Sequence, residues 1–216
     1  MQQATQLKRF LPPQIASLAL GEDHRKFLKL LEPHRRDIVV VFVDLSGFTA
    51  FTRNEEPEEM MRMLKEFNQT MGELVWKHEG TLDRFTGDGM MVFFNDPVEI
   101  PDPATRALRM TLEMRNAFEG LRGEWGKRGY ELGCRYGVAS GHATLGVVGF
   151  EKRWDYTAMG TVTNLSARLC AHAKDTEILV TKRLLASVEE RFASEDRGDI
   201  QLKGEPRPIG VVNLLS

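Results

Sequence analysis

An aspartate lies between two glycines in the segment RFTGDGMMVFF, which begins at Arg84. Apolar residues on both sides predict two short strands, and Gly-Asp-Gly is suitable for the tight turn between them. A simple β-turn would explain this pattern without any function. The same turn would also place the carboxylate of Asp88 at the tip of a hairpin, where it could bind a cation.

A second carboxylate, Asp44, ends the apolar run DIVVVFVDL, whose β-branched residues predict a buried strand. A predicted helix begins directly after it, at Ser46, Gly47, Phe48 and Thr49. The backbone N–H groups of these residues could donate hydrogen bonds to a phosphate. On its own, Asp44 could instead be the N-cap of that helix. Strand and hairpin can be neighbours in an antiparallel sheet, and two carboxylates beside a phosphate site indicate Mg²⁺ or Mn²⁺ binding.

The elements around these carboxylates are predicted in the order strand, helix, two strands, helix, strand. Both helices have a proline in the first turn, Pro57 and Pro103, and the second has Asp102 as its N-cap. The segment LGCRYGVASGHATLGVVG predicts two strands around Ser140 and Gly141. Apolar residues repeat at helical spacing in the first helix and predict its core face: Met60, Leu64, Phe67, Met71 and Leu74.

This βαββαβ order predicts an α+β fold of ferredoxin-like type, with helices on one face of a mainly antiparallel sheet. A third helix (TVTNLSARLCAHAK), a strand (EILVT) and a final hairpin (IQLKGEPRPIGVVNLL) predict a C-terminal elaboration. Residues 37–216 would form this domain. Residues 1–36, with a helix start at Pro12 and Pro13, would form a helical extension or linker.

The composition is that of an ordinary globular protein, with 42% hydrophobic and 28% charged residues among 216. A net charge of −2 predicts no general attraction to nucleic acid. No apolar run reaches the ~18 residues of a membrane span. Cys134 and Cys170 are expected to be core residues in a reducing cytoplasm, because two cysteines form neither a disulfide framework nor a metal cluster.

Three segments, FVDLSGFT, RFTGDGMMVF and DYTAMGTVTNLSARL, resemble the signature sequences of the class III nucleotidyl cyclases, the adenylate and guanylate cyclase catalytic domain. They occur in the right order and spacing, and the resemblance covers about residues 37–215. The Gly-Gly-Asp/Glu-Glu-Phe hairpin of the diguanylate cyclases, which share the core fold, does not occur in the sequence.

The resemblance implies a role for each matching residue. Asp44 and Asp88 resemble the pair that holds two Mg²⁺ or Mn²⁺ ions together with the backbone carbonyl of Leu45. Asn164 and Arg168 resemble the pair that orients the ribose and stabilises the transition state, and their spacing places both on one helix face.

The resemblance also implies phosphate contacts outside these motifs. Lys203 in LKG matches a lysine that contacts the terminal phosphates. Arg153 would match a phosphate-binding arginine, with Lys152 as the competing choice. A solvated loop cation remains the alternative for Lys203 and Arg153.

Arg84 and Thr157 occupy the positions that select the purine in the family. Many adenylate cyclases have lysine and aspartate there, whereas guanylate cyclases typically have glutamate at the first. Arg84 is a donor that cannot accept a hydrogen bond from guanine, so ATP is expected rather than GTP.

The sequence therefore predicts an adenylate cyclase that forms 3′,5′-cyclic AMP and pyrophosphate in a homodimer with two shared sites. A guanylate cyclase and a weakly active nucleotide-binding dimerisation module are the alternatives. A sensor domain could lie upstream in a longer protein.

Overall fold

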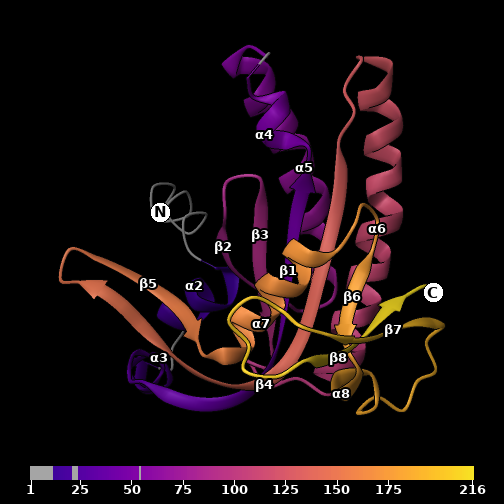
Figure 1. Cartoon of the computed structure of the whole chain (residues 1–216). Helices are drawn as coiled ribbons and strands as arrows, with labels where there is room; N and C mark the ends of the chain where they lie inside the picture. Colours follow the sequence, from indigo (N-terminus) through magenta and orange to yellow (C-terminus); the bar gives the residue numbers. More distant parts are fainter. Residues whose placement is uncertain (1–11, 21–23, 54) are drawn as a thin grey trace.

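The computed structural model describes residues 12–20, 24–53 and 55–216, and in it an eight-stranded sheet has the order β2-β3-β1-β4-β6-β8-β7, with β5 paired to β4 (Figure 1). The strands are β1 (His34–Ser46), β2 (Thr81–Phe85), β3 (Gly89–Phe94), β4 (Gly133–Phe150), β5 (Arg153–Met159), β6 (Ile178–Thr181), β7 (Ser194–Ile200) and β8 (Ile209–Leu214). The helices are α2 (Pro13–Leu20), α3 (His24–Leu31), α4 (Phe48–Phe51), α5 (Pro57–Lys77), α6 (Pro103–Lys127), α7 (Thr161–His172) and α8 (Lys182–Leu185).

The first four strands and the helices α5 and α6 confirm the predicted βαββαβ order. Along the sheet these strands lie in the order β2-β3-β1-β4, and every neighbouring pair is antiparallel. This is the ferredoxin-like arrangement, in which α5 connects β1 to β2 across β3, and α6 connects β3 to β4 across β1. Strand β6 joins β4 in parallel and begins the C-terminal elaboration. Strands β7 and β8 form a final hairpin, but its first strand ends at Ile200, where the predicted hairpin begins.

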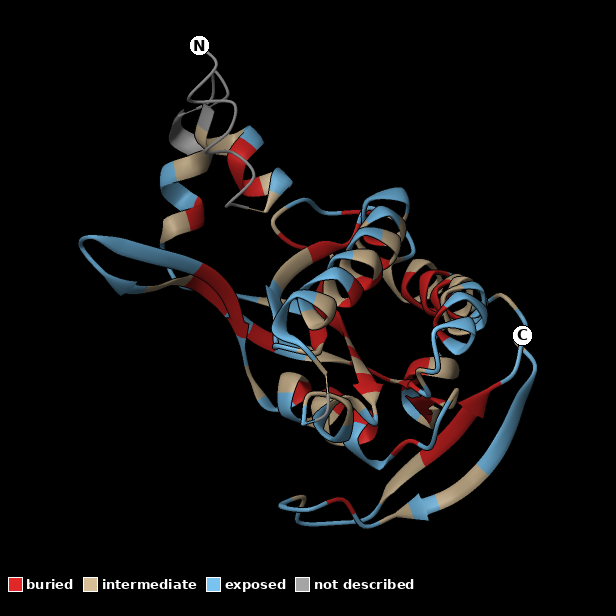
Figure 2. Ribbon diagram, turned by 90° about the horizontal axis from the view of Figure 1, so that it is seen from above, coloured by how far each residue is buried: buried red, intermediate tan, exposed pale blue. Residues whose placement is uncertain are grey.

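Helices cover both faces of the sheet, not one as predicted. Val39, Val41 and Val43 of β1 belong to the core that contains α5 and α6. Ile38 and Val40 belong to a second core on the other face, which contains α7 and the described N-terminal helices. Figure 2 shows the buried residues on the helix sides that face the sheet. A central strand that is apolar at successive positions needs cover on both faces, which is why the third helix lies opposite the first two.

Strand β4 is one continuous strand of 18 residues, so the prediction of two strands around Ser140–Gly141 is wrong. It pairs with β1 through Leu145 and with β5 from Thr144 onward, so neighbouring strands support it throughout. Gly141 therefore lies within a strand and not in a turn, and a Cβ there would make an ordinary contact with Val162 of α7 at 3.4 Å.

Two local predictions for the helices need correction. Asp102 occupies the N-cap position of α6 but has a left-handed backbone (φ 52°) and makes no side-chain capping hydrogen bond, while Pro103 begins the helix as predicted. Phe67 and Met71 of the predicted stripe on α5 are fully buried. The stripe is centred differently from the prediction, because Met63 and Val75 are buried whereas Met60, Leu64 and Leu74 are only partly buried.

The N-terminal helices pack on the domain, since Ile15 of α2 and Leu30 of α3 are buried in the second core. Strand β1 begins at His34, inside the segment predicted to be an extension. Both cysteines are buried as predicted, and burial raises the pKa of the Cys134 thiol to about 12. None of the helices described is long and apolar enough to cross a membrane.

Candidate active site

Asp44 and Asp88 lie side by side at the end of β1. The register places Asp44 opposite Gly89, and the backbone N–H of Leu45 donates to the carbonyl of Asp88 at 3.1 Å. The glycines are needed for this approach: a Cβ on Gly89 would lie 2.2 Å from the carbonyl oxygen of Val43, and Gly87 has a φ of 89°. The hairpin can therefore reach β1 closely enough to present the second carboxylate beside the first.

Arg135 of β4 partly balances the charge of this pair. It lies opposite Asp44, and its Nε and Nη2 donate to Asp44 Oδ2 at 2.9 and 2.6 Å. The pKa of Asp88 is raised, mainly because the carboxyl is partly buried and next because Asp44 carries a like charge, and Arg135 offsets this only in part. Sequence reasoning missed Arg135, although a cation within the apolar strand GCRYGV was a signal for it.

These residues fit a divalent metal. The two carboxylates and the Leu45 carbonyl are oxygen donors, which Mg²⁺ and Mn²⁺ prefer. Because Arg135 is bound to Asp44 and is the single arginine that the structure describes beside the pair, the two carboxylates lack one positive charge for balance. A divalent cation would supply that charge.

The turn after Asp44 continues into a single short helix. Ser46 ends β1, Gly47 follows with a φ of 87°, and α4 begins at Phe48. The rings of Phe48 and Phe51 lie 5.7 Å apart and pack against the main core. Ser46, Gly47, Phe48 and Thr49 therefore follow the first carboxylate directly, as predicted from their spacing.

The structure brings Arg84 and Thr157 together, although they are far apart in sequence. Arg84 lies on β2 and Thr157 on β5, and Nη2 of the arginine donates to Oγ1 of the threonine at 2.5 Å. Thr157 is 3% exposed. The Nε of Arg84 also donates to Asp83, so the guanidinium is held from two sides.

Asn164 and Arg168 lie one turn apart on α7. Asn164 is exposed, whereas Arg168 forms an ion pair with Glu205 in the loop between β7 and β8. Lys203 lies exposed in the same loop, and a Cβ on Gly204 would approach the Arg168 guanidinium to 2.8 Å. The arginine and the loop that contains Lys203 are therefore neighbours.

Arg153 and Lys152 lie at the exposed tip of the β4–β5 hairpin, which projects from the rest of the sheet in both views (Figures 1 and 2). Arg153 lies 3.6 Å from Asp155. Within the described part of the chain, no hydrogen bond or ion pair joins the two aspartates to the predicted base, ribose or phosphate residues. One chain thus leaves the two aspartates unconnected to these other site residues, which themselves form separate clusters.

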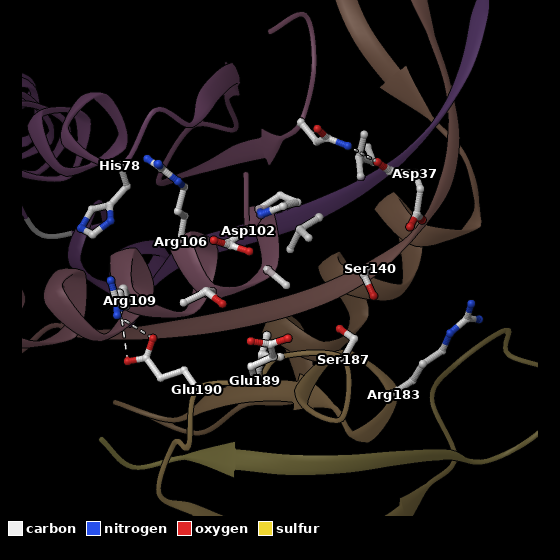
Figure 3. Close-up of a pocket in the computed structure, with 17 residues that line it drawn as sticks. Asp37, His78, Asp102, Arg106, Arg109, Ser140, Arg183, Ser187, Glu189 and Glu190 are labelled. Atoms are coloured by element: carbon white, nitrogen blue, oxygen red, sulfur yellow. Dashed lines mark hydrogen bonds and ion pairs between the residues drawn. The ribbon is translucent and has the colours of Figure 1, made fainter. Parts of the chain in front are cut away.

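A polar cavity of about 810 Å³ lies at the opposite end of β1, beside the start of α6 (Figure 3). Its arginines include Arg109, which forms an ion pair with Glu190 at 2.7 Å. Four carboxylates line it, namely those of Asp37, Asp102, Glu189 and Glu190. None of the predicted site residues lines this cavity.

Comparison with known proteins identifies the family. The model of the family described as "Adenylate and Guanylate cyclase catalytic domain" matches residues 31–213. Adenylate cyclase 1 of Rhizobium meliloti (strain 1021) is 29% identical over 184 residues, which cover 84% of this chain and 28% of that protein. The chain thus spans less than a third of the length of this curated relative.

Solved structures agree with the family match. The adenylyl cyclase CyaB from P. aeruginosa superposes with a TM-score of 0.83 and 32% identity, covering 86% of this chain and 97% of that one. The guanylyl cyclase Cya2 superposes with a TM-score of 0.80 and 29% identity, covering 84% and 92%. The mainly antiparallel α+β fold is therefore that of a cyclase catalytic domain. Together with the family match over most of its length, these likenesses show that the chain belongs to the class III adenylate and guanylate cyclase catalytic domain family.

Proposed function

We propose that the chain is an adenylate cyclase domain that converts ATP to 3′,5′-cyclic AMP and pyrophosphate. The observation that carries the choice of ATP is the contact between Arg84 and Thr157. Arg84 can only donate, which suits a ring nitrogen acceptor of adenine. The Thr157 hydroxyl accepts from Arg84 and retains a second lone pair for the exocyclic amine of adenine.

The reaction proposed is an in-line attack of the ribose 3′-oxygen on the α-phosphorus, with pyrophosphate as the leaving group. Asp44, Asp88 and the Leu45 carbonyl would hold two Mg²⁺ or Mn²⁺ ions. When bound, such ions lower the cost of forming the 3′-alkoxide and stabilise charge on the phosphates. Asn164 would orient the ribose, and Arg168 would face the charge that develops on the α-phosphoryl group.

Cationic and backbone groups would bind the triphosphate. Arg135 already lies against Asp44, and a polyphosphate beside that carboxylate would come within reach of its remaining donors. The N–H groups after Ser46, together with Lys203 and Arg153, would bind the phosphates in the proposed site.

We propose that the two groups of site residues meet across a homodimer. The aspartates and Arg135 would come from one subunit, and the base, ribose and α-phosphate residues from its partner. Their separation within one chain supports this arrangement, since a single chain would otherwise leave each half of the site incomplete. Two buried free cysteines are consistent with the reducing cytoplasm as the site of action.

A guanylate cyclase is the second candidate, because the protein described as the guanylyl cyclase Cya2 is 29% identical. The test measures cyclic-nucleotide formation from ATP and from GTP, each with Mg²⁺ and with Mn²⁺. The proposal expects cyclic AMP from ATP and much slower turnover of GTP, with Asp88→Ala as an inactive control. Faster turnover of GTP would transfer the assignment to guanylate cyclase, and no product from either would refute cyclase activity.

A further inference from the structure

A second, smaller cavity of about 240 Å³ lies between the N-terminal helices and the β4–β5 hairpin. Apolar residues of α2 and α3 line one side, among them Ile15 and Leu30. Val147 of β4 and the rings of Trp154 and Tyr156 of β5 line the other. An engineered cavity of about 150 Å³ is large enough to bind benzene, so this one has room for an aromatic ring with a short substituent.

One carboxylate in this apolar cavity lacks a partner. The side chain of Asp83 lines the cavity and is only 1% exposed. Its Oδ1 is buried and accepts no hydrogen bond from any described residue. A buried, unsatisfied carboxylate oxygen costs free energy that a donor or a cation would recover. The cavity therefore contains an unused anionic acceptor.

The remaining charge and the aromatic rings specify the ligand chemistry. Asp155 also lines the cavity, but its side chain is 64% exposed and lies 3.6 Å from Arg153. Among the lining residues that the structure describes there is no lysine or arginine. Aromatic faces attract cations, most strongly when the cation is removed from water. The buried Asp83 carboxylate and several aromatic residues around an apolar space form a site for an organic cation and repel an anion.

Asp83 also connects this cavity to the proposed base site. A bulge between Leu82 and Arg84 interrupts the pairing of β2 with β3, and such bulges redirect side chains. Asp83 Oδ2 accepts from the Nε of Arg84, whose Nη2 donates to Thr157. A single carboxylate of a cavity-lining residue thus has one oxygen without a partner and the other on the arginine proposed to select the purine.

We propose that this cavity binds a small organic cation, an ammonium group on an aromatic or apolar body, with Asp83 as its anchor. The bound cation would weaken the hold of Asp83 on Arg84 and so raise the KM for ATP. Only this second effect rests on the proposed adenylate cyclase activity. Binding itself does not depend on it.

The test titrates benzylamine, a cation at pH 7.5, and benzyl alcohol, its neutral counterpart, into the protein. The readout is the indole N–H signal of Trp154 in a ¹H–¹⁵N spectrum, assigned with Trp154→Phe. A charged hydrogen bond contributes about 1.5–3 kcal/mol, so benzylamine should bind roughly tenfold or more tightly than the alcohol. Asp83→Asn should remove that difference, and Ala19→Phe should fill the cavity and abolish binding of both compounds.

Asp199→Asn changes an exposed aspartate on β7 and is the matched control, which should bind benzylamine as the wild type does. No saturable shift at Trp154, or equal benzylamine affinity in folded Asp83→Asn, would overturn the proposal. If Asp83→Asn does not fold, undiminished binding to Ala19→Phe would overturn it. If the KM for ATP does not change at a saturating concentration of benzylamine, only the proposed coupling between the cavity and Arg84 is rejected. If no cyclase activity is found in any assay, the proposed function is rejected, but binding of the cation is not.

Discussion

At the scale of single residues, the candidate site is dominated by an imbalance of charge. Asp44 at the end of β1 and Asp88 in the turn between β2 and β3 are adjacent carboxylates, and Arg135 of β4 donates hydrogen bonds only to the first of them. A folded protein that holds two like charges together loses stability unless a cation is present. This arrangement disfavours the metal-free protein and favours the protein with a cation bound.

Removing the charge of Asp88 should stabilise the metal-free protein. The pKa of Asp88 is raised in the folded state above its ordinary value of 3.8, so the ionised form is the costly one. The penalty is therefore fully present above the folded pKa and disappears as pH falls below 3.8. In EDTA, Asp88→Asn should raise Tm at pH 7, and the gain should shrink as the pH is lowered toward 4.

The comparison with Mg²⁺ present is the control for this prediction. Magnesium should raise the Tm of the wild type more than that of Asp88→Asn, because the variant lacks one proposed ligand. A lower Tm for the variant at pH 7 in EDTA, or equal stabilisation of both proteins by Mg²⁺, would contradict the proposed role.

Purine choice is the second prediction at this scale. Arg84→Lys should keep ATP turnover, since lysine retains a donor at the same place. Arg84→Glu should lower kcat/KM for ATP and raise the relative use of GTP, because glutamate can accept from guanine. Losing one such hydrogen bond to the base should reduce transition-state stabilisation, as measured by kcat/KM, by about 1–3 kcal/mol. The measurement is kcat/KM for both triphosphates in all three proteins, and an unchanged ATP/GTP ratio in Arg84→Glu would exclude Arg84 from base recognition.

At the scale of elements, the packing of α7 on β4 determines where Asn164 and Arg168 lie. A Cβ on Gly137 would come within 2.3 Å of the Cys170 N and the Ser166 carbonyl oxygen. The Ser166 hydroxyl is buried and lies 2.9 Å from the Val40 carbonyl and 2.7 Å from that of Gly137. The helix is therefore held against the sheet without room for adjustment.

Gly137→Ala should consequently displace α7. Inserting a methyl group into a well-packed contact costs typically 1–3 kcal/mol, measurable as a loss in the free energy of unfolding. Cyclase activity should fall further than stability alone explains, because Asn164 and Arg168 move with the helix.

Gly120→Ala is the matched control, since a Cβ at this position of α6 has no neighbouring atom within 4 Å. It should leave activity unchanged and stabilise the protein by up to about 1 kcal/mol, as expected for an exposed helical glycine. Equal effects of the two substitutions would show that α7 can adjust its position.

At the scale of the whole molecule, one chain contains both halves of the proposed site but keeps them apart. The aspartates lie at the end of β1, whereas Arg168 on α7 is paired with Glu205 in the loop that contains Lys203. In a symmetric dimer, the aspartates of each subunit could face Arg168 and Lys203 of the other subunit. Such a dimer would complete two sites at once.

Mixing inactive Asp44→Ala with inactive Arg168→Ala should therefore restore activity. Each heterodimer has one site with both defects and one with neither, so an equal mixture should recover about a quarter of the wild-type rate. Mixing Asp44→Ala with Asp88→Ala is the control: both defects lie in the same half, every site has one, and no rescue is expected. Absence of rescue in the first mixture, with subunit exchange demonstrated, would contradict a shared site.

Much of the fold was predictable from the sequence because its signals are local. The β-branched run before Asp44, the Gly-Asp-Gly turn and the prolines at Pro57 and Pro103 indicate strands, a hairpin and helix starts from neighbouring residues alone. The order of these elements then leaves few ways to form a sheet. The βαββαβ core, the presence of a final hairpin and the burial of both cysteines followed from it.

What only the tertiary structure decided concerns partners that are distant in the chain. The pairing of Arg135 with Asp44, the continuity of β4 through Gly141 and the place of α7 on the second face all depend on which strands and helices become neighbours. The absence of a side-chain cap at Asp102 is a different case, because it follows from the left-handed backbone conformation of that residue, which the sequence pattern did not indicate. Residue types and spacing predict which groups can do chemistry, whereas the distances between those groups are set by packing, which joins residues that the sequence separates.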